Sequence, residues 1–273
     1  KLGPRTLVIV VSQSGETADT IASLRMARKA GSPVLAVCNV VGSTICREAD
    51  ARILASAGPE IAVASTKAYI AQLAAMFLLA LYLGRTGGTI TRADSAPLLE
   101  AYDGLPDMIT AILARDAEMK AMGEKYCNAP AALYLGRHFN FPTALEGALK
   151  NKEISYMHSD GFPAGEMKHG PIALINDQLP VICLCPRGRS REKMLSNIQE
   201  IKARSGRVLA IATEGDEKIL KLADDVIFIP QTLEMLNPIL SVIPLQLFAY
   251  HTADLLGLDV DKPRNLAKSV TVE

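Results

Sequence analysis

Long apolar segments alternate with amphipathic segments along most of the chain. Residues 6–39 read as an apolar strand, a short polar turn, an amphipathic helix and a second apolar strand, and residues 48–56 add a third strand after an Ala-Asp pair. Residues 179–213 and 222–230 repeat the same order, again with Ala-Asp before the last strand. Continuous Val, Ile and Leu strands that alternate with helices are typical of parallel sheets covered on both faces. The pattern therefore predicts an α/β protein with two tandem doubly wound parallel sheets, each a three-layer αβα unit of flavodoxin-like type.

The two copies of this pattern differ in completeness. Residues 131–175 precede the second copy and add a strand, a helix and a loop, whereas nothing comparable precedes the first. We therefore expect the opening strand and helix of the first domain to lie upstream of Lys1. The segment 91–126 reads as helices that link the two copies. The expected domains are a first, N-terminally incomplete domain over 1–89, a second domain over 90–257 and an irregular C-terminal tail over 258–273.

The longest apolar run is Tyr69–Gly84, which contains Gln72. It is short for a membrane span, which needs roughly 20 apolar residues. A buried core helix or a helix at a subunit interface is the better interpretation.

Composition narrows the classes of function. The chain has 273 residues, and its 29 Lys and Arg balance its 29 Asp and Glu. Zero net charge argues against broad nucleic-acid binding, which needs a basic face. Five cysteines are scattered without a CxxC pair, which favours a reducing compartment over a zinc or disulfide protein.

A polar turn follows the first strand. Ser12, Gln13, Ser14 and Thr17 fall between the end of that strand and the start of a helix, where open α/β sheets bind ligands. Free backbone N–H groups and the positive end of a helix dipole favour an anion there, and Gly15 allows close backbone approach. The alternative is that Ser14 or Thr17 only caps the helix. Because neither a GxxxxGK[ST] nor a GxGxxG motif is present, a phosphomonoester fits better than a nucleotide.

The corresponding turn of the second copy reads "CPRGRS" and lacks the serine pair. We therefore expect one phosphate site for the two copies. Glu16 should point away from the bound anion.

A second candidate site lies on the helix "TALEGALKNKEISYM". Glu146, Lys150 and Glu153 stand at i, i+4 and i+7 and share one helical face. They are either a solvated ion-pair face or the acid–base groups that proton transfer between adjacent sugar carbons requires. The neighbouring apolar stripe expected to face the core consists of Leu145, Ala148, Leu149 and Tyr156.

The following loop, "PAGEMKHGP", places His169 beside charged residues and a glycine. A lone histidine is often structural, but a histidine in such a loop is a candidate for function.

Five motifs together carry a specific resemblance: "SQSGETADT", "ASTKAY", "ALEGALKNKEISY", "AGEMKHGPIAL" and "DVDKPRNLAKSVTVE". They resemble the isomerase half of the glutamine–fructose-6-phosphate aminotransferases, which is a pair of sugar isomerase (SIS) domains. The first motif alone would indicate only the wider SIS family, whereas the terminal motif is much narrower.

The resemblance implies roles for individual residues. Glu153 would be the base that moves a proton between C1 and C2 of the sugar, with Lys150 assisting at the oxygens and Glu146 in support. His169 would promote ring opening from a neighbouring subunit, and Lys268 would form a Schiff base with the sugar carbonyl. The residues implied in binding fructose 6-phosphate are Ser12, Gln13, Ser14 and Thr17 at the phosphate, Val63 and Ser65 at the sugar, and Arg264, which orders the tail that closes the site.

The resemblance also implies the partners. The substrates and products would be fructose 6-phosphate, glucosamine 6-phosphate or glucose 6-phosphate, in a cytoplasmic homodimer that needs no metal or other cofactor and binds neither nucleic acid nor membrane. The glutaminase domain that supplies ammonia in the family is not part of this sequence. Two alternatives stay open: another SIS enzyme acting on an amino-sugar phosphate, such as a deglycase, and a non-catalytic module that senses sugar phosphates.

Overall fold

The computed structural model describes residues 1–267, and the chain divides into two compact units. Of the described residues, unit 1 contains 1–95 and 264–267, and unit 2 is Ala96–Pro263. The domain boundaries expected from the sequence remain predictions. The helices and strands are β1 Val8–Ser12, α1 Ala18–Lys29, β2 Val34–Cys38, α2 Thr44–Glu48, β3 Ala51–Leu54, α3 Lys67–Thr86, α4 Arg92–Asp103, α5 Leu105–Leu113, α6 Asp116–Tyr126, β4 Ala131–Gly136, α7 Asn140–Ser155, β5 His158–Pro163, η1 Ala164–His169, η2 Pro171–Leu174, β6 Pro180–Cys185, α8 Arg191–Lys202, β7 Arg207–Thr213, α9 Glu217–Leu220, β8 Asp225–Ile229, η3 Glu234–Leu236 and α10 Asn237–Leu255.

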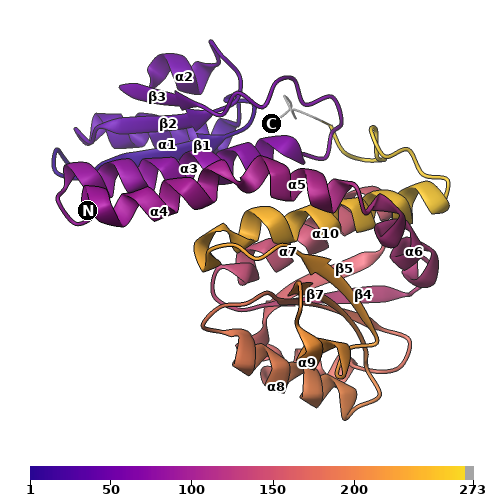
Figure 1. Ribbon diagram of the computed structural model, residues 1–273. Coiled ribbons are helices and arrows are strands. Elements are labelled where there is room, and N and C mark those ends of the chain that lie inside the picture. The colour runs from indigo at the N-terminus through magenta and orange to yellow at the C-terminus, as the bar shows by residue number, and fades with distance from the viewer. Residues whose placement is uncertain (268–273) are drawn as a thin grey trace. The chain divides into compact units, whose positions relative to one another are not determined.

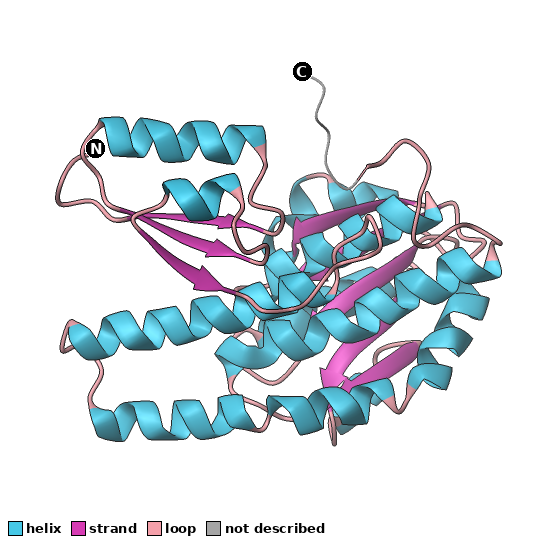
Figure 2. Ribbon diagram, turned by 90° about the horizontal axis from the view of Figure 1, so that it is seen from above, coloured by secondary structure: helices cyan, strands magenta, loops and turns pink. Residues whose placement is uncertain are grey.

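Unit 1 contains a three-stranded parallel sheet in the order β1-β2-β3 (Figure 2). The polar turn directly follows β1 and leads into α1. Leu24 and Ala27 of α1 and Ile45 of α2 pack with Val10 and Val34 of the strands in one buried cluster. This packing fixes the carboxyl end of β1 and the start of α1 relative to each other.

Unit 2 contains a five-stranded parallel sheet in the order β5-β4-β6-β7-β8. In chain order this is 2-1-3-4-5, the flavodoxin-like arrangement. Helices α7 and α10 cover one face of the sheet, and α8 and α9 cover the other (Figure 1). The predicted doubly wound parallel sheets are therefore confirmed, as are helices in the segment 91–126.

The prediction for the buried face of α7 was wrong in part. Leu145 and Leu149 are each 43% exposed, whereas Lys150 is only 4% exposed. The reason is the close approach of α7 to its neighbours: a Cβ added at Gly147 would lie 2.6 Å from Cδ1 of Leu245 in α10. The small residues Ala144, Gly147 and Ala148 of α7 therefore face the interior of unit 2, and Leu145 and Leu149 lie on the exposed side of the helix.

Helix α3 contains the long apolar run. It is long and apolar enough to cross a membrane by length and composition alone, and 17% of its most apolar window is buried. Such a helix is weak evidence for a membrane span. Because so little of it is buried in the described chain, the interpretation as a core helix is not supported, and that of a subunit-interface helix stays a prediction.

Candidate functional site

The turn after β1 is held by its own hydroxyl groups. Oγ of Ser12 accepts a hydrogen bond from the backbone N–H of Gly15 at 2.9 Å and lies 3.4 Å from Oγ1 of Thr17. Oγ of Ser14 accepts from the backbone N–H of Glu16 at 3.2 Å. Thr17 occupies the N-cap position of α1, yet its side chain makes no capping hydrogen bond. The alternative that Thr17 serves only as a helix cap is therefore not supported, and the first N–H groups of α1 are not satisfied by the Thr17 side chain.

Gly15 allows the turn to close. Its φ of +71° lies in the left-handed region, and a Cβ added there would overlap Oγ of Ser43 and approach Sγ of Cys38 to 2.8 Å. Glu16 accepts a hydrogen bond at 2.8 Å from the backbone N–H of Thr44, which also lowers the pKa of its carboxyl group. Its carboxylate is thus held at the start of α2, and the expectation that it points away from a bound anion stays a prediction.

The segment that leads to α3 is fixed by a residue that the sequence analysis missed. Glu60 accepts hydrogen bonds from Oγ of Ser65 at 3.0 Å and from the backbone N–H of Ala68 at 3.0 Å. Ser65 is therefore held in place, and Val63 precedes it in a partly buried position. The only sequence signal for Glu60 was a carboxylate shortly before an uncapped helix start.

Asn39, a second missed residue, ties the turn to this segment. Its backbone N–H donates to the carbonyl of Gln13 at 3.3 Å, while its side chain bonds the backbone of Ala57 and Gly58, both at 2.9 Å. The Gln13 turn and the chain that approaches Val63 thus share one hydrogen-bonded support within unit 1.

In unit 2, Lys150 lies between two carboxylates of α7. Its Nζ is 2.6 Å from Oε2 of Glu153 and 3.5 Å from Oε1 of Glu146. The Lys150 side chain is almost fully buried, and those of Glu146 and Glu153 are 13% and 23% exposed. The sequence prediction that the three share a face is confirmed, and the interpretation as a solvated ion-pair face is wrong.

Burial sets the protonation chemistry of this cluster. Burial raises the pKa of Glu146, the attraction of Lys150 offsets that only in part, and the nearby charge of Glu153 adds to the rise. One carboxylate with a raised pKa, a second in direct contact with an ammonium group and a cation between them form an arrangement suited to proton transfer.

His169 ends the short helix η1 and is exposed. Met167 in the same helix is fully buried and anchors it to the core of unit 2. Within the described residues, no hydrogen bond or ion pair joins His169 to the α7 cluster. Its predicted action from a neighbouring subunit is left untested.

The predicted tail residues are only partly described. Arg264 is exposed in the irregular segment after Pro263, and Lys268 lies outside the described residues. Among residues 1–267, no group of three or more His, Cys, Asp or Glu side chains could hold a metal ion.

A family model for the SIS domain matches residues 1–82 and 125–255, which is most of the chain. The chain belongs to the SIS domain family. Both the polar turn after β1 and the Lys150 cluster of this SIS chain lie inside the matched residues.

Two relatives narrow the branch of the SIS family. The glutamine–fructose-6-phosphate aminotransferase [isomerizing] of Thermus thermophilus is 55% identical over 269 residues, which covers 98% of this chain and 44% of the relative. The chain thus spans less than half of that relative's length. The solved C-terminal domain of glucosamine-fructose-6-phosphate aminotransferase from Francisella tularensis matches with a TM-score of 0.90 and 36% identity, over 94% of this chain and 73% of that one. The SIS chain therefore matches the C-terminal isomerase half of these enzymes.

A more distant structure shares only the fold. Glucosamine-6-phosphate deaminase from Thermotoga maritima matches with a TM-score of 0.75 and 21% identity, over 99% of this chain and 76% of that one. At this identity it gives no support to the alternative of a deglycase.

Proposed function

We propose that this chain is the isomerase half of a glutamine–fructose-6-phosphate aminotransferase, which converts fructose 6-phosphate and ammonia to glucosamine 6-phosphate. The observation that carries the proposal is the buried Lys150 in contact with Glu153 and Glu146 on one face of α7. Burying charged side chains costs free energy of folding, so a buried Lys–Glu cluster is expected where it has a chemical role. A module that only senses sugar phosphates transfers no proton and does not need such a cluster.

Substrate binding begins at the turn of unit 1. The hydroxyls of Ser12, Ser14 and Thr17, the side chain of Gln13 and the start of α1 bind the phosphate of fructose 6-phosphate. Val63 and Ser65 contact the sugar. Asn39 supports this placement, because it bonds both the backbone of Gln13 in the turn and the backbone of Ala57 and Gly58, shortly before Val63.

The chemistry then proceeds on the open-chain sugar. His169, supplied by the second subunit of a homodimer, promotes ring opening. The ε-amine of Lys268 condenses with the C2 carbonyl and releases water, and ammonia displaces the lysine to leave an imine at C2.

The isomerisation step uses the α7 cluster. Glu153 removes a proton from C1 and returns it to C2, while the hydroxyl proton of O1 is lost and the C2 nitrogen gains one, so that the imine of the ketose becomes the 2-amino aldose. Lys150 stabilises the charge that develops on the sugar oxygens, Glu146 supports Lys150, and Arg264 orders the tail that carries the Schiff-base lysine.

The partners and location complete the proposal. Ammonia comes from glutamine through a glutaminase domain, and the proposal is supported by the names of the matched relatives, which include glutamine. We place the enzyme in the cytoplasm, consistent with its match to metabolic enzymes.

The test is product formation by the purified chain, first shown to be folded by cooperative thermal unfolding. Incubated with fructose 6-phosphate and ammonium chloride, it should form glucosamine 6-phosphate, and without ammonium it should interconvert fructose 6-phosphate and glucose 6-phosphate. A folded sample that neither forms these products nor binds glucose 6-phosphate would contradict the proposal.

Two further experiments separate the roles. Borohydride reduction in the presence of fructose 6-phosphate should attach the sugar to Lys268, and attachment to another lysine would reassign the nucleophile. Mixing inactive His169→Ala and Glu153→Gln variants should restore part of the activity if the histidine acts across subunits. No recovery in a mixture shown to exchange subunits would place His169 in its own chain's site.

A further inference from the structure

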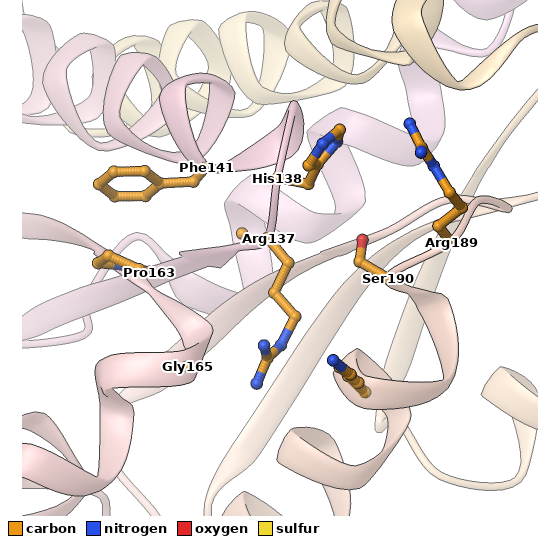
Figure 3. A pocket seen from close by; sticks show the side chains of 9 residues that line it. Arg137, His138, Phe141, Pro163, Gly165, Arg189 and Ser190 are labelled. Carbon is orange, nitrogen blue, oxygen red and sulfur yellow. The ribbon is translucent and has the colours of Figure 1, made fainter.

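A cavity of about 500 Å³ lies in unit 2, away from the Lys150 cluster. It opens where β4, β5 and β6 end, and its lining comes from the ends of β4 and β5 and from residues that follow these three strands (Figure 3). The chain leaves β4 through α7 toward β5 on one side, while β6 pairs with β4 on the other. The cavity therefore occupies the topological switch point of the sheet, where open α/β sheets bind ligands.

The turn beside this cavity has the same length as the phosphate turn of unit 1. In unit 1 the strand ends at Ser12 and the helix starts at Ala18, and in unit 2 the strand ends at Cys185 and the helix starts at Arg191. Ser190 occupies the N-cap position of α8 that Thr17 occupies in α1, and neither side chain makes a capping hydrogen bond.

The charges around the cavity are of one sign. Of the nine described residues that line it, none is Asp or Glu, and the lining includes Arg137, His138, Arg189, Ser190 and Lys193. Within the described part of the chain, neither Arg137 nor Lys193 forms an ion pair. An unpaired cation in a recess favours an anionic ligand.

Arg137 is held in place without being neutralised. Its Nε and Nη2 donate to Oδ1 of the buried Asn197 at 3.0 and 2.8 Å, and Nδ2 of Asn197 in turn donates to Glu200 at 3.3 Å. An amide oxygen orients the guanidinium but leaves its charge uncompensated. Figure 3 shows Arg137 and Ser190 beside the cavity, with the Ser190 hydroxyl directed to the side where His138 lies.

Arg189 is the cation of the lining that has an internal partner. Glu234 accepts from its backbone N–H at 2.9 Å and from its Nε at 3.0 Å. The carboxylate thus holds the turn in shape and neutralises one arginine, which leaves Arg137, Lys193 and Ser190 for a ligand.

From this arrangement we infer that unit 2 carries a second anion site, which binds the phosphoryl group of a small molecule between Arg137, Ser190 and Lys193. The site is separate from the substrate phosphate site proposed in unit 1. The expectation of one phosphate site for the two copies rested on the missing serine pair, but arginine and lysine replace those hydroxyls as donors.

Equilibrium dialysis with radiolabelled inorganic phosphate, repeated with labelled glucose 6-phosphate, tests the inference. Four proteins are compared: the unaltered chain, Arg137→Gln/Lys193→Gln, Ser14→Ala/Thr17→Val, and the control Arg204→Gln/Lys221→Gln. The control removes two positive charges of unit 2 outside the cavity. We expect the unaltered chain to show two classes of phosphate-binding site. In the Arg137/Lys193 variant the affinity of one class should fall by at least about tenfold, because charge-assisted hydrogen bonds to the phosphate are lost.

The outcomes separate this inference from the proposed function. Loss of binding only in the Ser14/Thr17 variant would overturn the second site and leave the substrate site intact. Loss only in the Arg137/Lys193 variant would support the second site and contradict the phosphate site of unit 1. An equal loss of phosphate affinity in the Arg204/Lys221 control would show that the affinity depends on the net charge of the protein and not on the cavity. That result would overturn the inference. Binding of phosphate alone identifies free phosphate as the ligand, and binding of both identifies an ester site.

A second measurement is independent of variant folding. Crystals of the unaltered chain soaked in tungstate, a phosphate mimic, should show an anomalous peak within hydrogen-bond reach of Arg137 and Lys193. Occupancy of the unit 1 turn with an empty cavity in unit 2 would contradict the inference.

Discussion

The ammonium group of Lys150 lies 2.6 Å from a carboxylate oxygen of Glu153, and both side chains belong to the same face of α7. The contact holds the Glu153 carboxylate in one orientation through a short, charge-assisted hydrogen bond. A carboxylate held in one orientation is what a base needs in order to take a proton from a carbon atom of a bound substrate.

Glu153→Gln should lower the rate of proton exchange between C1 and C2 of the sugar by about 10²- to 10⁴-fold, because glutamine keeps the shape but cannot accept a proton. Loss of tritium from labelled fructose 6-phosphate measures that exchange. Phosphate binding at the turn of unit 1 should be unchanged. Glu124→Gln, on the exposed surface of α6, is the matched control and should exchange at the normal rate. A normal rate in Glu153→Gln would remove Glu153 from its proposed role.

Lys150→Met should destabilise the protein by about 3–5 kcal/mol at pH 7.5, because it leaves two carboxylates buried without their cation. Burial already raises the pKa of Glu146, and without the ammonium group of Lys150 that pKa rises further, so the folded variant takes up a proton there as the pH falls. The loss of stability should therefore grow as the pH rises through the raised pKa of Glu146 and shrink toward pH 5. Urea unfolding at both pH values measures it.

The neighbouring Lys152 provides the control. Its ion pair with Asp160 at 3.0 Å is about half exposed, so Lys152→Met should cost less than about 1 kcal/mol. Equal losses in the two variants would show that burial of Lys150 does not govern its contribution.

Gly15→Ala should cost about 2–5 kcal/mol and abolish phosphate binding at the turn, because the new Cβ meets Ser43 and adopts a left-handed backbone. Gly58 separates the two effects, since its φ is also +71° but a Cβ added there meets nothing within 4 Å. Gly58→Ala should cost only about 1–2 kcal/mol and leave phosphate binding intact. Thermal unfolding with and without glucose 6-phosphate compares the two, and equal phosphate stabilisation in both variants would count against the turn as the site.

The parallel sheets were predictable because Val, Ile and Leu form unbroken runs between amphipathic helices. The grouping of Glu146, Lys150 and Glu153 was predictable from helical spacing alone. Helical spacing says nothing of depth, however. The burial of Lys150 depends on how closely α10 and β4 approach Gly147, where a Cβ would lie 3.2 Å from the ring of Tyr134.

The supporting residues of the site escaped sequence reasoning for a related reason. Asn39 acts across a distance in the chain that no local pattern records, because it bonds the backbone of Ala57 and Gly58 from the end of a different strand. Glu60 bonds residues only a few positions ahead, but it lies before the N-cap position of α3, where a capping carboxylate is not looked for. Arg137 and Lys193 are likewise far apart in sequence and line one cavity only because β4 and β6 are neighbours.

Asp216 gives the last prediction, on stability. Burial pushes the pKa of its carboxyl up, but hydrogen bonds from Arg191 and from the backbone amides of Ile219 and Lys218 outweigh that effect, so the net pKa is lowered. A lowered pKa means that the stabilisation is complete above the unfolded pKa of about 3.9 and is lost as the pH falls through the folded value. Asp216→Asn should cost about 3 kcal/mol at pH 7, because it removes the buried carboxylate partner of Arg191 and leaves that side chain only its pair with the exposed Glu192.

The pH dependence distinguishes this loss from simple misfolding. The difference in free energy of unfolding between Asp216→Asn and the unaltered chain should narrow below about pH 4, where the carboxylate takes up its proton. The exposed Asp254 is the control, and Asp254→Asn should change stability by no more than about 0.5 kcal/mol at either pH. A difference that stays constant from pH 7 to pH 3 would mean that the charge of Asp216 does not stabilise the start of α9, and that the side chain acts there only as a neutral hydrogen-bond acceptor.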